Sequence, residues 1–208
     1  MKKLLLISAF FMTTQVLAED IKLNPISIDA NDTLMQAIQN RASSRDYAAN
    51  KTIPEKTLSE LLWVAAGINR KDQNKKTVPS ALNKQAIDVY YVDAKGAYLY
   101  DPATHSLILK NAGDFRKDAG KQPFVANAAA NLIYVADYSK YLPEIAERSA
   151  QEKLAAMDAA FGAENVYLYA AKVGLKTVVR GSVDPKKLSE ILKLKETQQA
   201  LLGQCIGY

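Results

Sequence analysis

The sequence is poor in the residues that build disulfides, zinc sites and nucleophilic triads. Of its 208 residues only one is cysteine and one is histidine, so an internal disulfide is excluded and a usual zinc site cannot be built. The nucleophile-elbow pattern G-x-S-x-G is absent as well, and nothing indicates a serine hydrolase. We expect Cys205, in the apolar run 201–208, to be a buried thiol and His105 to be a surface turn residue.

Long hydrophobic runs are also missing, and the apolar run 4–12 is too short to span a bilayer as a permanent helix. This run follows Lys2 and Lys3 and leads to the small-residue end of Val16-Leu17-Ala18, which is the pattern of a secretory signal peptide. We therefore expect residues 1–18 to be removed after Ala18. The mature chain, 19–208, is then a single exported, periplasmic domain without stable membrane insertion. The alternative is a retained N-terminal helix.

Charge of one sign is not in large excess. The formal net charge is +5, and removal of the two N-terminal lysines leaves 5 − 2 = +3. No basic stripe interleaved with aromatic residues is present, so we expect no nucleic-acid partner. Hydrophobic residues make up 49% and charged residues 24% of the chain, proportions that are ordinary for a folded globular domain.

Helical signals come first along the mature chain. Asp32 can cap a helix from Thr33 to about Asn40, and Pro54 can stand in the first turn of a second helix that ends at Gly67. The polar, basic stretch after this helix is expected to be a solvated loop. After it, the pattern of apolar residues changes from the helical one to that of β-strands. The loop is expected at 69–77. An antiparallel meander is predicted at 87–92, 97–100 and 107–109, and a buried central strand at 131–136.

The Ala-rich stretch 143–173 has apolar residues around most of its helical circumference. Such a helix is buried on most sides, so we expect it to lie in the core or in the interface of a homodimer. Gly174 is expected to end this helix. A strand, a helix and a last strand follow, at 177–180, 185–194 and 201–208. Because helices and strands do not alternate regularly, the predicted fold class is α+β.

Three short segments, far apart in sequence, carry groups that suit a flavin nucleotide. The first contains Arg41, Ser43 and Arg45, followed by Tyr47. Two forked guanidiniums with a hydroxyl between them suit a phosphate dianion, and extended backbone would place these alternate residues on one side. A solvated basic turn would have the same composition.

The second segment runs from Pro79 to Gln85 and includes Ser80 and Asn83. Its hydroxyl and carboxamides can match the alternating donors and acceptors on the pyrimidine edge of a flavin, although an ordinary polar loop would look alike. In the third segment, 177–182, Gly181 lets the backbone approach a flat ligand closely.

Together these segments resemble the nitroreductase-like family of FMN-dependent flavoproteins. The family pattern Arg-x-Ser-x-Arg/Lys-x-aromatic stands here at 41–47, and the pattern P-S-[SA]-x-N-x-Q stands at 79–85. An interface helix followed by Gly-Leu and a strand is matched by 158–180, and the end Ile-Gly-Tyr by 206–208. The similarity extends over almost the whole mature chain.

The resemblance implies a central, mostly antiparallel sheet flanked by helices, and a homodimer with two FMN molecules at its interface. Arg41, Ser43 and Arg45 would then hold the phosphate and ribityl chain. The ring would meet the remaining candidates, which are Ser80, Asn83, Gln85, Arg180 and Gly181. Gly181 would offer its backbone N–H near the reactive flavin nitrogen.

The expected activity is the transfer of two electrons to or from a small organic substrate, such as a nitro compound or a quinone. The electron donor and the catalytic side chains are not identified by the sequence, and no metal is expected. A flavin-binding or partner-binding module without turnover is the main alternative, and a structural domain without a chromophore is a third.

Two features depart from the family pattern. Arg180 stands where many relatives carry an acid or a small residue, and beside the ring its charge would favour the anionic reduced flavin. Arg180 could instead point to solvent or pair with Asp184. The chain also ends at Tyr208, without the C-terminal extension that adds phosphate contacts in some relatives, so we expect a weaker hold on the phosphate.

Overall fold

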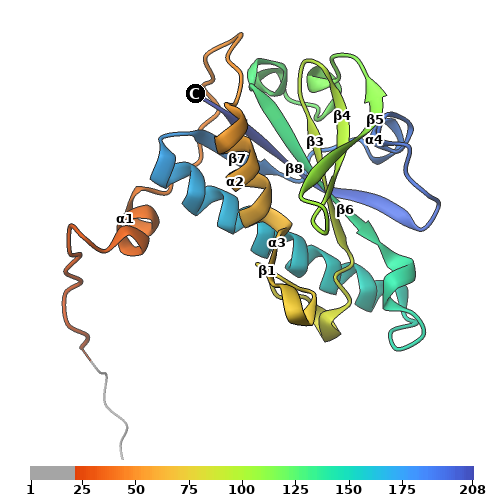
Figure 1. Cartoon of the computed structure of the whole chain (residues 1–208), viewed down its shortest axis with the longest axis horizontal. Helices are drawn as coiled ribbons and strands as arrows, with labels where there is room; N and C mark the ends of the chain where they lie inside the picture. The colour runs from red at the N-terminus through yellow and green to blue at the C-terminus, as the bar shows by residue number, and fades with distance from the viewer. Residues whose placement is uncertain (1–21) are drawn as a thin grey trace, which may run out of the picture.

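The computed structural model describes residues 22–208 and contains a six-stranded sheet. The order of the strands is β5-β4-β3-β6-β8-β7, and every neighbouring pair is antiparallel. The expected signal peptide, 1–18, lies outside the described residues. The strands, which can be followed in Figure 1, are β3 (Ile87–Val92), β4 (Gly96–Asp101), β5 (Ser106–Ala112), β6 (Ala130–Asp137), β7 (Lys176–Arg180) and β8 (Gln198–Gly207).

The central strand is β6, between β3 and β8, and all eight of its residues are buried. Burial on both faces explains why its sequence is a continuous apolar run rather than an alternating one. The predicted meander is confirmed as β3, β4 and β5, and the predicted last strand as β8. The α+β class and the antiparallel sheet are therefore confirmed.

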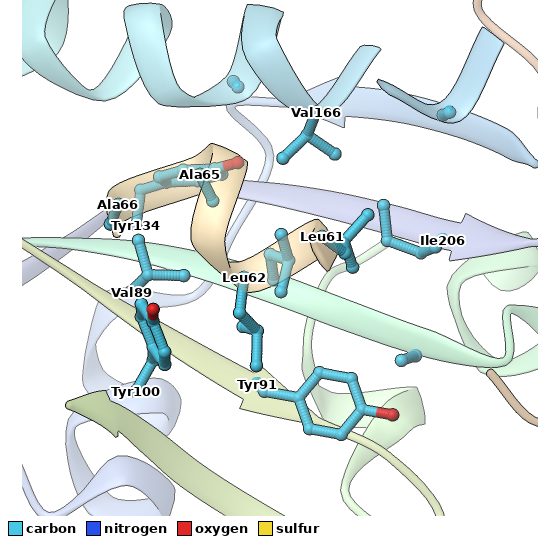
Figure 2. Close-up of a cluster of buried hydrophobic side chains, with 14 of the residues drawn as sticks. Leu61, Leu62, Ala65, Ala66, Val89, Tyr91, Tyr100, Tyr134, Val166 and Ile206 are labelled. Atoms are coloured by element: carbon cyan, nitrogen blue, oxygen red, sulfur yellow. The ribbon is translucent and has the colours of Figure 1, made fainter. Parts of the chain in front are cut away.

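Helices cover both faces of the sheet. The helices α2 (Glu55–Ala66) and α3 (Arg148–Val173) pack on one face, where Leu61, Tyr134 and Val166 belong to the main core cluster (Figure 2). The opposite face is covered by α4 (Pro185–Leu192) and by the short helical turns η3 (Arg116–Asp118) and η4 (Pro123–Asn127). The result is a three-layer arrangement with the sheet in the middle.

The long helix α3 runs close to α2 at Gly162. A Cβ atom at this position would lie 2.7 Å from the carbonyl oxygen of Ala65, so the approach of the two helices requires glycine. Gly174 ends α3 with φ of 75°, as predicted. The helix starts at Arg148, five residues later than the Ala-rich stretch, and Glu144 in the loop before it pairs with Lys84.

The N-terminal part of the described chain contains α1 (Thr33–Asn40), which is capped by the side chain of Asp32 as predicted. This helix lies beside α3, away from the sheet (Figure 1). The predicted solvated loop at 69–77 lies at the surface, but it is not all loop, since β1 (Ile68–Arg70) and β2 (Lys75–Lys76) form a small hairpin. Asn74, in the left-handed conformation with φ of 49°, reverses the chain there. Within residues 22–208 no helix has the length and apolarity needed to cross a membrane.

Candidate functional site

The segment 41–47 covers the outer edge of the sheet. The backbone N–H of Ser44 donates to the carbonyl of Thr177 in the edge strand β7, at 2.9 Å, and Ala48 N–H donates to Tyr208 O at 2.7 Å. The buried Tyr47 turns inward, and its hydroxyl donates to Ser44 O at 2.7 Å. These bonds hold the segment against two strands that are more than 120 residues away in sequence.

Tyr167, on α3, joins this segment to β7. Its hydroxyl oxygen lies 2.9 Å from Ser43 Oγ and accepts the backbone N–H of Val179 at 2.8 Å. The guanidinium of Arg41 lies over the Tyr167 ring, 5.4 Å from its centroid, within the range of a cation–π contact. Arg41, Ser43 and the end of β7 are therefore brought together. Tyr167 was not predicted, because its spacing on the helix fits an apolar face.

The two arginines of the segment remain available to an anion. Arg41 and Arg45 are exposed, and within the described part of the chain neither side chain makes an ion pair or a hydrogen bond. Arg45 lies over Phe124, 6.0 Å from the ring centroid, and so does not share the contact of Arg41 and Ser43 with Tyr167. Arg41 beside the Ser43 hydroxyl offers donors that suit a phosphate group, whereas Arg45 lies apart from them over Phe124.

Gly181 follows β7 directly and is exposed. No atom lies within 4 Å of the place where its Cβ would be, and its φ is not in the left-handed region. Packing within the described chain therefore does not require glycine here. The open space beside the backbone leaves room for a flat ligand two residues beyond Val179, whose N–H bonds to Tyr167.

Arg180 corrects the sequence-based prediction. The residue is only 6% exposed, and its guanidinium donates to Ala119 O at 2.8 Å, to Asn131 Oδ1 at 2.6 Å and to Cys205 Sγ at 3.3 Å. Side chains alternate between the faces of a strand, and Val179 packs with α3 while Val178 belongs to the opposite face. The guanidinium of Arg180 therefore points away from α3, and it reaches neither solvent nor Asp184.

Cys205 and His105 have the predicted locations. Cys205 is fully buried, and burial raises the pKa of its thiol. His105 is exposed, at the turn between β4 and β5, with Ser59 Oγ 2.7 Å from Nε2 and the Tyr100 hydroxyl 2.8 Å from Nδ1. Among residues 22–208, His, Cys, Asp and Glu form no group of three that could hold a metal ion.

The second candidate segment forms a tight loop beside the first half of α3. The hydroxyl oxygen of Ser80 accepts Gln85 N–H at 2.9 Å, which leaves its hydrogen free to donate. Asn83 is exposed, and the Gln85 carboxamide donates to Asn74 O at 2.7 Å. The backbone N–H of Ala81 donates to both carboxylate oxygens of Asp158, at 3.2 Å each.

The two clusters are separated along α3. Asp158, which holds the loop with Ser80, precedes Tyr167 by nine residues, and at 1.5 Å per residue the two positions lie about 13 Å apart along the helix axis. Within one chain the structure therefore groups Arg41 and Ser43 with Tyr167 near the end of β7, and Ser80 with Gln85 and Asn83. It does not bring the two groups into contact.

These observations indicate a protein that binds a phosphorylated ligand at the edge of its sheet. A helix-covered antiparallel sheet carries an unpaired cationic group at its edge, next to open space at a strand end, and a polar loop farther along the same helix. Pockets for phosphorylated ligands are built from such groups.

Comparisons with known proteins give the family. Residues 38–208 match the model of the Nitroreductase family. A solved structure of a protein described as a nitroreductase, from Ralstonia eutropha JMP134, has a TM-score of 0.78 at 38% identity, covering 92% of this chain and 87% of that one. A protein of Methanocaldococcus jannaschii, also named as a nitroreductase, is 32% identical over 167 residues, which are 75% of this chain and 82% of that protein.

A more distant relative is the NADPH-flavin oxidoreductase of Vibrio harveyi, 30% identical over 96 residues, which are 43% of this chain and 40% of that protein. The chain belongs to the Nitroreductase family. The family resemblance seen in the sequence is thereby confirmed, and the protein is of the oxidoreductase class.

Proposed function

We propose that the protein is an FMN-dependent oxidoreductase that transfers two electrons to or from a small organic substrate, such as a nitro compound or a quinone. The observation that carries this proposal is the exposed guanidinium of Arg41 beside Ser43 on Tyr167, at the edge of the sheet where β7 ends at the open space beside Gly181. Family membership and the flavin named for the Vibrio harveyi relative support it.

The donor set fits a flavin mononucleotide. In the proposed site Arg41, Ser43 and Arg45 hold the phosphate and the ribityl chain, because guanidiniums and a hydroxyl match a dianion. The backbone at Gly181 lies against the ring, where no side chain intervenes. FMN supplies the two-electron chemistry when it is bound, and these residues bind and orient it. The electron donor is not identified by any side chain of the site.

We further propose that two copies of the chain complete each site. The outer face of α3 carries the exposed side chains of Met157 and Phe161, with 43% and 46% exposure, and the exposed Leu82 lies on the loop beside this helix. Exposed apolar residues in a group mark a surface that another chain covers. If two α3 helices pair in opposite directions, the loop with Ser80 and Asn83 from one copy reaches the site of the other, which accounts for their separation within one chain.

The place of action proposed from the sequence is the periplasm, after removal of residues 1–18. The intact mass of the protein recovered from the periplasmic fraction tests this directly. A mass that begins at Glu19 supports export, and a full-length chain in the cytoplasmic fraction contradicts it.

The cofactor proposal is tested by titrating the purified protein with FMN and following the quenching of flavin fluorescence. Arg41→Ala should weaken binding about tenfold to a hundredfold, since a lost charge-assisted bond to a dianion costs about 1.5–3 kcal/mol. Arg148→Ala is the matched control. It also removes an arginine from the face of a tyrosine, Tyr138, but it lies 19 residues before Tyr167 on the same helix.

The parent protein must bind FMN, and Arg148→Ala must bind it equally well. Equal affinity of Arg41→Ala and the parent would remove Arg41 from the site, and absence of any FMN binding would overturn the proposed function. Single-turnover reduction and reoxidation with nitro and quinone acceptors then separates an enzyme from a binding module without turnover.

A further inference from the structure

The loop between Ser80 and Gln85 has an unusual backbone. Leu82, Asn83 and Gln85 have φ of 50°, 54° and 48°, in the left-handed region that residues with a side chain adopt only at a cost. Leu82 is also 69% exposed, so burial of its side chain does not compensate for this conformation. The loop therefore needs bonds to the rest of the protein to keep its shape.

One of these bonds comes from a buried carboxylate on α3. Both oxygens of Asp158 lie 3.2 Å from the backbone nitrogen of Ala81, the first residue of the turn. Asp158 is 5% exposed, and within residues 22–208 it makes no ion pair. Burial raises the pKa of this carboxyl group, while the Ala81 N–H and the Tyr141 phenol act in the opposite direction.

The fold gains little stability from this charge. A carboxylate that is taken out of water without a cation is unfavourable, and an aliphatic or amide side chain would pack on α3 without that cost. Outside its own helix the carboxylate accepts the backbone N–H of Ala81 in the loop, and the Tyr141 phenol is the other group that stabilises its charge. Beside the loop lies a small cavity of about 20 Å³, which Ser80, Gln85 and Lys76 also line. A residue retained at a cost to stability indicates a role in a site.

We propose that Asp158 is a positioning residue for the cofactor site. Its carboxylate fixes the backbone of Ala81 and thereby sets the direction in which the Ser80 hydroxyl and the exposed Asn83 carboxamide face the flavin ring. The inference rests on the proposed function for its ligand. The anchoring of the loop itself is a property of the protein without flavin and can be measured separately.

Three variants test the hydrogen bond between Asp158 and Ala81 by changing either its acceptor or its donor. Asp158→Ala removes the acceptor, whereas Asp158→Asn keeps one oxygen that can accept the Ala81 N–H and removes only the charge. Ala81→Pro removes the donor instead, and the backbone permits it, since the preceding Ser80 is extended, with φ −145° and ψ 149°, and proline suits the first position of a helical turn. Gln151→Ala is the control, because Gln151 is also buried on α3 and its side chain donates to Ile145 O, outside the loop 79–85.

The first measurement is amide hydrogen exchange of the segment 79–85 in the protein without flavin. We expect exchange to be at least tenfold faster in Asp158→Ala and in Ala81→Pro than in the parent, and close to the parent in Asp158→Asn and Gln151→Ala. The second is the visible circular dichroism of bound FMN at saturation, together with its affinity. Asp158→Ala and Ala81→Pro should lose the circular dichroism signal of the parent and should bind FMN about tenfold more weakly.

The thermal midpoint separates positioning from loss of fold. We expect Asp158→Asn to melt at or above the parent temperature, because it removes a buried charge. Its exchange rate and its flavin signal should both equal those of the parent. Unchanged exchange and an unchanged flavin signal in Asp158→Ala and Ala81→Pro would overturn the inference, as would an Asp158→Asn protein that behaves like Asp158→Ala. A parent protein that binds no FMN overturns the proposed function instead, and the exchange experiment still decides whether Asp158 anchors the loop.

Discussion

The buried guanidinium of Arg180 and the glycine opposite it provide a direct test of the packing behind the site. Gly203 is the cross-strand neighbour of Arg180, and a Cβ atom there would lie 2.6 Å from Nη1 and 2.9 Å from Cζ of the arginine. The end of an exposed arginine would move aside, but three hydrogen bonds hold this one. Gly203→Ala should therefore destabilise the protein by about 1–3 kcal/mol, as overpacking of a core usually does.

The same substitution should be harmless once the guanidinium is gone. Arg180→Met leaves Ala119 O without the guanidinium donor, at about 1–3 kcal/mol for a buried acceptor, and leaves Asn131 Oδ1 with only the weaker Cys205 thiol donor at 3.2 Å. Part of this loss is offset because a buried charge disappears, so we expect Arg180→Met to cost about 2–4 kcal/mol. The backbone of Gly203 is not left-handed, and alanine in a strand is favoured over glycine by about 0.5–1 kcal/mol. In the Arg180→Met protein, Gly203→Ala should therefore be neutral or slightly stabilising.

The assay is urea unfolding of the parent, the two single variants and the double variant, with the free energy of unfolding and its slope compared. The predicted coupling between the two positions is about 1–3 kcal/mol, well above the additivity error of about 0.5 kcal/mol. Additive effects within that error would refute the packing described for Arg180. A parent-like stability of Arg180→Met would do so as well.

Two further predictions concern the dimer and the response to acid. Phe161→Asp, at an exposed position on the outer face of α3, should convert a dimer into a monomer in light scattering. Ile108→Asp, at an equally exposed apolar position on the edge strand β5, is the control. A parent protein that is a stable monomer with flavin bound would contradict the proposed interface. The guanidinium of Arg116 bonds to Asp114 at 3.0 and 2.7 Å and holds the pKa of that carboxyl below its usual value. A lowered pKa in the folded state adds stability above the unfolded pKa that disappears as the pH falls through the folded one, so Asp114→Asn should cost about 0.5 kcal/mol at pH 7 and nothing near pH 2. An equal cost at both pH values in urea unfolding would show that the charge is not responsible.

Much of the secondary structure follows from short-range features of the sequence. Asp32 caps α1 and Gly174 ends α3, because these signals act within one helical turn. The apolar run at 131–136 predicts a central strand for a similar reason, since only a strand covered on both faces is apolar at every position. The candidate phosphate segment was also found in the sequence, because Arg41, Ser43 and Arg45 lie within five residues of one another.

The direction of Arg180 was decided only by the tertiary structure. The sequence determines that Val178 and Arg180 share one face of a strand and that Val179 lies on the other. It does not determine which face meets α3, because that depends on the register of β7 against β8, and β8 lies more than 20 residues further along the chain. A shift of one residue would have turned the guanidinium toward α3.

Tyr167 and Asp158 show the same limit at the site itself. On the helix they are two polar groups nine residues apart, and their local spacing says nothing about their partners. Their bonds go to Ser43, 124 residues away in the chain, and to Ala81, 77 residues away. Local chemistry thus determined many of the helices and strands and the segment that we propose to bind a phosphate. The packing of α3 against the sheet decided which of these segments meet, since contacts between distant residues arise only when the whole core closes.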